Sequence, residues 1–203
     1  MKILSFILFM LFLNCLILVC IPILIFISLI IVMTSGLPIF FIEDRVGLNG
    51  KNFRLFKFRT MVKNAPRLKS KVKYLNEADG PVFKIHHDPR FTKIGRYLSH
   101  TGLDELPQLF NVLKGEMALI GPRPLPIAES SKLKSWQLKR LQIKPGIISP
   151  WIVSGYHNQS FSKWMKSDIK YVQNKNFFID VVVLIQSIVF VIKQLIHETK
   201  ISI

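Results

Sequence analysis

The chain has 203 residues, half of them hydrophobic, and its formal net charge is +16. This combination is unusual for a soluble enzyme, because the hydrophobic residues gather at the two ends and the charge lies between them. A basic body between hydrophobic ends indicates attraction to an anionic surface: a phospholipid membrane, a nucleic acid or a phosphorylated substrate. The two cysteines, Cys15 and Cys20, both lie in the first hydrophobic run, which excludes a disulfide framework or a cysteine metal site.

The first hydrophobic run has no charged residue from Ile3 to Met33. As a helix with a rise of about 1.5 Å per residue it is roughly 46 Å long, against about 30 Å for the hydrocarbon core of a bilayer. We therefore predict a membrane-embedded helix over residues 1–34, kinked at Pro22 because proline removes one helical hydrogen bond. The helix either spans the bilayer at a tilt or bends and leaves by the face that it entered. Lysines and arginines at 51–67 follow it and Lys2 alone precedes it, which predicts a cytoplasmic body.

Residues 35–203 are predicted to form one α+β domain that is mostly helical. Its first element is a basic strand at 53–60, and a helix followed by a loop is expected within 64–87. Two helical patterns at 92–99 and 104–113 come next, followed by a short hydrophobic run at 117–120. Prolines and glycines separate these from further helices at about 128–142 and 161–174.

The last predicted element is a second hydrophobic run at about 177–196. Four polar residues interrupt it: Asp180, Gln186, Lys193 and Gln194. It is a weak transmembrane span, a buried helix or a helix lying on the membrane surface, and the polar residues favour the last two.

Two adjacent carboxylates, Asp104 and Glu105, stand at the start of the 104–113 pattern. Pro107 has no N–H, so it is tolerated only in the first helical turn and predicts a helix that starts near Asp104. The positive end of the helix dipole favours the ionised carboxylates that a nucleophile or a hard-cation ligand requires. Acidic residues in a first turn also serve capping alone, so capping is the competing interpretation.

Two further segments carry cations suited to phosphate. In GPRP at 121–124, Pro122 and Pro124 restrict the backbone on both sides of Arg123, whose guanidinium suits bidentate phosphate recognition, although an ordinary surface turn fits too. In KFRTM at 57–61, Lys57 and Arg59 point to the same side of the predicted strand. That basic face meets either a pyrophosphate or lipid headgroups, and the sequence does not separate the two.

Together with further segments, these motifs occur in an order that resembles one family. The matching segments are RVG at 45–47, KFRTM at 57–61, DPR at 88–90, GR at 95–96, LDELPQLFNVLKG at 103–115, GPRP at 121–124, KPG at 144–146 and the Asp and Tyr of 168–171. They resemble the monotopic bacterial phosphoglycosyl transferases, also called bacterial sugar transferases or undecaprenyl-phosphate sugar phosphotransferases, of the minimal single-domain type. The family's membrane helix is re-entrant and broken at a Ser-Pro pair. Pro22 follows Ile21 here, so a re-entrant helix is expected.

The resemblance implies a two-step reaction at the cytoplasmic face of the bacterial inner membrane, as the first membrane step of polysaccharide or glycoconjugate assembly. The Asp104 carboxylate would attack the sugar-linked phosphate of a nucleotide sugar, usually a UDP-sugar, and hold the phosphosugar covalently. Polyprenol phosphate would then accept the phosphosugar, with Glu105 as the base. Mg²⁺ at Asp104 would shield the diphosphate. The implied substrate-binding residues are Lys57, Arg59, Pro122, Arg123, Pro124 and Asp168.

The chain departs from the family pattern at several positions, among them Gly102, where a Ser is usual, and Ile148-Ser149, where a Thr-Gly pair is expected. Ser99 stands where a basic residue is usual, and Ile152 and Tyr156 stand where a Gln and an Arg are expected. These changes remove polar contacts and favour one alternative, a catalytically silent, membrane-anchored relative that acts as a binding scaffold. A nucleic-acid partner is not expected, because the body has no regular alternation of basic and aromatic residues. A homodimer is left open.

Overall fold

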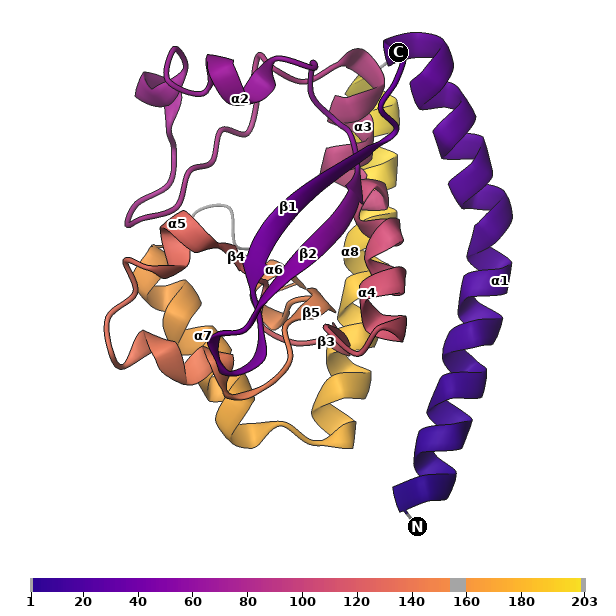
Figure 1. Cartoon of the computed structure of the whole chain (residues 1–203), viewed down its shortest axis with the longest axis vertical. Helices are drawn as coiled ribbons and strands as arrows, with labels where there is room; N and C mark the ends of the chain where they lie inside the picture. Colours follow the sequence, from indigo (N-terminus) through magenta and orange to yellow (C-terminus); the bar gives the residue numbers. More distant parts are fainter. Residues whose placement is uncertain (1, 154–159, 202–203) are drawn as a thin grey trace.

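The computed structural model describes residues 2–153 and 160–201. Helices predominate and the strands are few and short, which confirms the α+β, mostly helical prediction (Figure 1). The two long helices are α1 (Lys2–Ser35), which lies along one edge of the molecule in Figure 1, and α8 (Phe177–Ile201). Within the described part of the chain, two helical stretches are long and hydrophobic enough to cross a membrane, Ile7–Ser35 and Phe177–Ile196.

Helix α1 is continuous through Pro22. Figure 1 shows one unbroken helix that bends along its length, and the kink at Pro22 and the re-entrant path through a membrane stay predictions. A proline removes only one hydrogen bond from a long helix. Contacts on both sides of Pro22, from Ile17 and Cys20 before it and from Ile27 and Ile31 after it, hold α1 along the rest of the protein.

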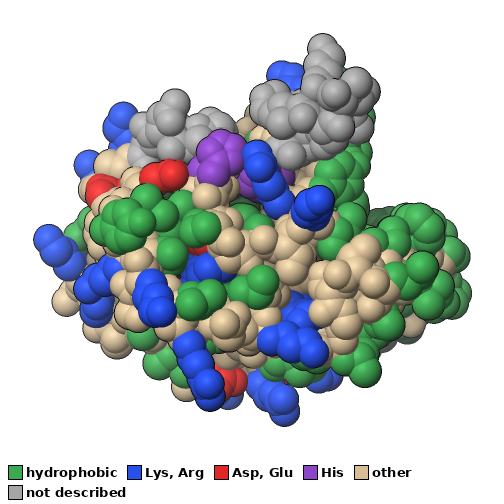
Figure 2. Space-filling view, turned by 90° about the horizontal axis from the view of Figure 1, so that it is seen from above, with side chains coloured by type: hydrophobic (Ala, Val, Ile, Leu, Met, Phe, Trp, Pro, Cys, Tyr) green, Lys and Arg blue, Asp and Glu red, His purple; other side chains and the backbone are tan. Residues whose placement is uncertain are grey.

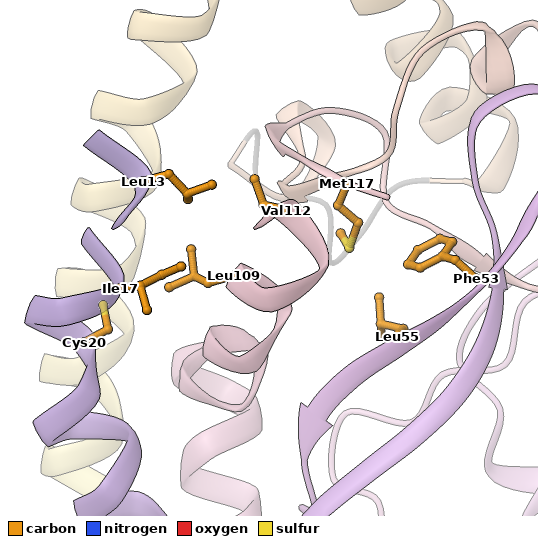
Figure 3. Packing of buried hydrophobic residues seen from close by; sticks show 8 residues of the cluster. All are labelled: Leu13, Ile17, Cys20, Phe53, Leu55, Leu109, Val112 and Met117. Atoms are coloured by element: carbon orange, nitrogen blue, oxygen red, sulfur yellow. The ribbon is translucent and has the colours of Figure 1, made fainter. Parts of the chain in front are cut away.

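One stripe of α1 is buried, and its residues recur at helical spacing. Figure 3 shows Leu13, Ile17 and Cys20 facing two buried residues of α4 (Leu109–Leu113), Leu109 and Val112. The same cluster reaches Phe53, Leu55 and Met117 in the interior. The opposite side of α1 is hydrophobic and exposed. The helix therefore shares one core with the body instead of standing apart from it.

A hairpin of β1 (Phe40–Val46) and β2 (Asn52–Phe58) forms the main sheet, with Phe40 opposite Phe58. The short β4 (Leu125–Pro126) pairs with the free edge of β1. Separately, β3 (Ala118–Ile120) runs parallel to β5 (Gly146–Ile148). The strand predicted at 53–60 is confirmed as β2, although it ends at Phe58, and the run at 117–120 becomes β3.

Most predicted helices are present, and three were wrong in detail. The patterns at 92–99 and 161–174 correspond to α3 (Lys93–Thr101) and α7 (Phe161–Asn174). The pattern at 104–113 is a 3₁₀ helix, η3 (Leu103–Gln108), continued by α4. Residues 128–142 fall into two short helices, α5 (Ile127–Ser130) and η4 (Gln137–Gln142). Residues 64–87 hold only two short helices, α2 (Ala65–Leu68) and η2 (Lys73–Leu75). Two short elements complete the set, η1 (Leu48–Gly50) and α6 (Pro150–Val153).

Candidate active site

The two carboxylates lie on η3, at the end of α3. Gly102 ends α3 with φ 75°, a left-handed conformation that glycine adopts without a Cβ clash, and the chain turns there into η3. Burial of Pro107 and Gln108 holds η3 in the protein, and Asp104 is itself only 5 % exposed. Asp104 is therefore a buried carboxyl on a tightly packed turn.

A cavity of about 500 Å³ opens beside these carboxylates. Both Asp104 and Glu105 line it. Five Lys and Arg side chains share its wall. Arg90 is paired with Asp88, and the other four are Arg45 from β1, Lys57 from β2, Lys84 from the loop before α3, and Arg123 from the GPRP loop. Another part of the wall is more hydrophobic and includes Trp151, Ile152, Val153, Phe190 and Val191 from α6 and α8. One part of the wall suits an anion and another part an apolar group.

The carboxyl of Asp104 has a pKa above its usual range. Burial raises the pKa of its carboxyl to about 7, and the charge of Glu105 adds to the rise, whereas Lys57 and Arg123 oppose it. Glu105 meets Arg123 in an ion pair with an Oε1–Nη1 distance of 2.6 Å. Burial therefore works against the ionised form of Asp104 that the helix dipole was expected to favour. Only a short 3₁₀ helix is present, and loss of water around the carboxylate outweighs its dipole.

Lys84 is a site residue that the sequence reasoning missed. Burial lowers the pKa of its amine to about 8, the charge of Arg123 adds to the fall, and Glu77 opposes it. The signal available in the sequence was a lone lysine between the hydrophobic Phe83 and Ile85, which is typical of a half-buried cation. Its place in the wall adds a positive charge close to Arg123.

The GPRP loop is held from several directions. Arg45 donates from Nη1 to the carbonyl of Pro124 at 2.9 Å, and Pro124 lines the cavity. The carbonyl of Pro122 accepts from the Gly146 N–H at 3.0 Å, which ties this loop to β5. Pro122 is buried and outside the cavity wall, so its part is to hold the loop that presents Arg123.

Asp168 does not reach the cavity. It is fully buried and receives two hydrogen bonds from Arg140, from Nε at 3.0 Å and from Nη2 at 2.7 Å. Arg140 Nη2 also donates to the backbone carbonyl of Arg123 at 2.6 Å. Asp168 therefore acts on the site through Arg140, as a positioning residue, and Arg140 is the second residue that sequence reasoning missed.

Arg59 is also directed away from the carboxylates. Its guanidinium donates to the carbonyls of Ser35, at 2.8 Å, and Gly36, at the end of α1. Lys57 stays in the cavity wall, so the structure separates two residues that the strand pattern placed on one face. Side chains alternate between the two faces of a strand only within the strand, and β2 ends at Phe58, one residue before Arg59.

The departures from the family pattern other than Tyr156 can be placed, and Gly102, Ile148 and Ser149 all line the cavity. Ser99 and Ile152 both line the cavity, and Ile152 puts an apolar side chain where a polar one was expected. Tyr156 lies outside the described residues.

The carboxylates of the cavity fit a magnesium ion that is held partly by substrate phosphates. Among the described residues no three metal-ligating side chains gather into a protein-built metal site. Mg²⁺ needs fewer protein ligands, because it is commonly held by one or two carboxylates together with substrate phosphates. The charge of Glu105 raises the pKa of the adjacent Asp104 carboxyl, and a cation held by Asp104 would offset that repulsion.

Comparisons with known proteins point in one direction. A family model described as "Bacterial sugar transferase" matches residues 2–194. The galactosyl transferase CpsE of Streptococcus agalactiae is 41% identical over 74% of this chain and 34% of its own length. The undecaprenyl-phosphate galactose phosphotransferase of Salmonella typhimurium is 36% identical over 80% of this chain and 35% of its own length.

Another relative is matched over more of its length. The exopolysaccharide production protein ExoY of Rhizobium meliloti is 33% identical over 82% of this chain and 76% of its own length. The chain thus spans about a third of CpsE and of the Salmonella protein, and three quarters of ExoY.

Proposed function

Because this chain belongs to the bacterial sugar transferase family, we propose that it transfers a sugar 1-phosphate from a nucleotide sugar to polyprenol phosphate. A UDP-sugar is the usual donor implied by the family, and the reaction would begin polysaccharide or glycoconjugate assembly. One observation carries the proposal: a buried carboxyl, Asp104, lies beside the Glu105–Arg123 ion pair in a cavity walled by cations. The name of the Salmonella relative supports the polyprenol acceptor.

The first step is a displacement at phosphorus. A carboxylate oxygen of Asp104 bonds to the sugar-linked phosphorus, the bond from that phosphorus to the bridging oxygen breaks, and a nucleoside monophosphate leaves. Arg123, Lys57 and Lys84 surround the phosphates and stabilise the charge that builds up on the leaving group. Bound Mg²⁺ would supply further neutralisation of the diphosphate there.

The second step reverses the roles around Asp104. A phosphate oxygen of the acceptor bonds to the phosphorus of the aspartyl phosphosugar, and the Asp104 carboxylate leaves. Glu105 takes up the proton if the acceptor phosphate still carries one. The hydrophobic part of the wall, with Trp151 and Phe190, suits the isoprenoid chain of the acceptor, and the cationic part suits both phosphates.

We place this reaction at the cytoplasmic face of the bacterial inner membrane. The basic residues that follow α1 support this orientation through the positive-inside bias. The exposed hydrophobic sides of α1 and α8 support contact with a phospholipid membrane.

A silent scaffold is the second candidate function. Ile152 in the cavity wall favours it, because an isoleucine gives no hydrogen bond to a bound sugar nucleotide. The intact set of Asp104, Glu105, Lys57 and Arg123 in one cavity favours the enzyme.

The test is release of UMP from a panel of UDP-sugars by the detergent-purified full chain, with Mg²⁺ and undecaprenyl phosphate. Wild type is compared with Asp104→Asn and with Asp44→Asn, a control that removes an exposed carboxylate outside the cavity. We expect release by wild type and by the control, and its loss in Asp104→Asn. No release from any donor by folded wild-type protein would favour the scaffold.

A further inference from the structure

A second cavity lies apart from the one beside Asp104. Its volume is about 740 Å³, and it opens between the end of α1 and the start of α3. Hydrophobic side chains form part of its lining: Ile30 from α1, Val62, Ile94 and Tyr97. Arg59, Lys63 and Lys93 add three cations.

Backbone separates this cavity from the one beside Asp104. Met61 and Phe91 form an isolated antiparallel bridge, and the Thr92 N–H donates to the Thr60 carbonyl at 3.0 Å. Gly95 allows the two backbone segments to approach this closely, because a Cβ there would lie 1.8 Å from the Thr60 oxygen. Among the described residues, the two cavities have no lining residue in common. A phosphate bound in the second cavity therefore cannot serve as the acceptor at Asp104.

Arg59 lines this cavity and carries a buried donor that has no partner among the described residues. The residue is 6 % exposed, and its Nη2 atom donates to the Ser35 and Gly36 carbonyls. Its Nε has no hydrogen-bond partner among the described residues. A buried guanidinium donor left without a partner is costly, so a ligand that accepts from it would be stabilised. The same guanidinium covers the negative carbonyl end of α1, which would otherwise repel an anion.

The position along the chain indicates the ligand. The cavity lies at the last turn of α1, where the hydrophobic stretch Ile7–Ser35 ends and where the headgroup layer meets a membrane-embedded helix. Lys63 and Lys93 are exposed beside hydrophobic lining residues. Figure 2 looks onto this end of the molecule and shows Lys and Arg side chains spread over a face that borders the hydrophobic surface of α1.

We propose that this cavity binds the headgroup of an anionic phospholipid. The phosphate would accept from the free Nε of Arg59 and lie between the Lys63 and Lys93 amines, and an acyl chain would follow Ile30 along α1. This assigns the two cations of the KFRTM segment to different anions, Lys57 to the donor and Arg59 to a structural lipid. The inference concerns lipid binding alone and does not depend on the transferase reaction.

The test measures lipid binding to the delipidated full chain in detergent by native mass spectrometry. Phosphatidylglycerol is titrated as the anionic lipid, with phosphatidylcholine and inorganic phosphate in parallel. The Lys63→Gln/Lys93→Gln variant is compared with Lys71→Gln/Lys73→Gln, which removes the same charge from exposed lysines outside both cavities. We expect phosphatidylglycerol binding to weaken about tenfold in the first variant and to stay unchanged in the second. Phosphatidylcholine and inorganic phosphate should bind more weakly to every protein.

Arg59→Lys gives an independent arm, since lysine keeps the charge but has no planar fork, and it should also weaken phosphatidylglycerol binding. Thermal unfolding of each variant confirms that it is folded. Equal lipid binding by the Lys63/Lys93 variant and its control would overturn the proposal. So would displacement of phosphatidylglycerol by undecaprenyl phosphate together with a raised acceptor KM in that variant, because the cavity would then belong to the acceptor.

Discussion

The protonation state of Asp104 depends on three charged neighbours. Lys57 lowers the pKa of its carboxyl and Glu105 raises it. Since the ionised form is the nucleophile, UMP release should rise with pH through the folded-state pKa of about 7. Lys57→Met should move this rise to higher pH by about one unit, and Glu105→Gln should move it to lower pH.

Single-turnover UMP release, measured in buffers from about pH 5 to about pH 9, checks the shift to higher pH and the shift to lower pH. The Lys51→Met variant serves as the control, because Lys51 is exposed and outside the cavity. Identical pH profiles for Lys57→Met and Lys51→Met would show that Lys57 does not act on Asp104.

The same raised pKa makes a prediction for stability. Below the unfolded-state pKa of Asp104 its carboxyl is protonated in both the folded and the unfolded state. As the pH rises from there through about 7, the unfolded state releases the proton first, so the free energy of unfolding falls. Asp104→Asn has no such loss. The Tm of Asp104→Asn minus the Tm of wild type should be larger at pH 8 than at pH 5 by about 5–10 °C, measured by intrinsic fluorescence in detergent. A difference that does not change with pH would contradict this account.

The buried ion pair of Arg140 and Asp168 stabilises the fold and also holds the Arg123 backbone in place. Asp168→Asn leaves Arg140 without its counter-charge, and it should lower the free energy of unfolding by about 3 kcal/mol. UMP release should also fall, by roughly tenfold or more, because Arg140 would no longer hold the Arg123 carbonyl in place.

A double variant separates the two effects. Arg140→Met/Asp168→Leu replaces the ion pair with apolar side chains of similar size, and it should recover most of the stability. It should not recover UMP release, since no donor to the Arg123 carbonyl remains. Recovery of both would mean that the pair supports the fold alone.

At the scale of elements, the stripe on α1 decides how firmly this helix is held. Ile17 lies in the stripe and is buried against α4, whereas its neighbour Leu18 is 65 % exposed. Ile17→Ala should lower the free energy of unfolding by about 2–4 kcal/mol, and the matched Leu18→Ala should change it by less than about 0.5 kcal/mol in detergent. Thermal unfolding of both variants gives the comparison. Equal effects would show that α1 does not pack on the body.

The elements that sequence predicted well are those with a long local pattern. Helix α7 has the predicted bounds, and β2 was found from its alternating aromatic residues. The η3 turn was taken for an α-helix because its hydrophobic spacing suits both forms. Residues 128–142 carry helix-forming side chains throughout, and nothing local marks the break between α5 and η4.

The candidate site divides in the same way. Asp104, Glu105, Lys57 and Arg123 were predicted from their motifs and do line one cavity. The partner of Asp168 is Arg140, 28 residues earlier in the chain, and no local pattern reveals such a pair. Lys84 enters the cavity through a loop whose path depends on tertiary contacts.

For the whole molecule, the directions of the two long helices limit how it sits in a bilayer. Figure 1 shows α1 and α8 running the same way, and α3 contacts both. Two such helices cannot both cross a membrane if the polar domain that connects them stays on one side. We therefore expect α8 to lie at the membrane surface or against the body, as the polar residues in it favour.

Impermeant maleimide labelling checks this expectation. Single cysteines at Lys175, before α8, and at Lys193, near its end, are introduced after Cys15 and Cys20 are changed to alanine. In sealed inverted membrane vesicles both positions should be labelled from the same face. Labelling of the two positions from opposite faces would show that α8 crosses.

The buried stripe of α1 also bears on the order in which the chain is made. Leu109, the partner of Leu13 and Ile17, is synthesised 96 residues after Leu13. During that interval the ribosome exposes a helix whose docking surface does not yet exist, and such a hydrophobic segment aggregates unless it is captured. Early delivery to the bilayer would protect the helix until α4 emerges. The membrane would then act as a folding partner for α1 before it acts as the place of catalysis.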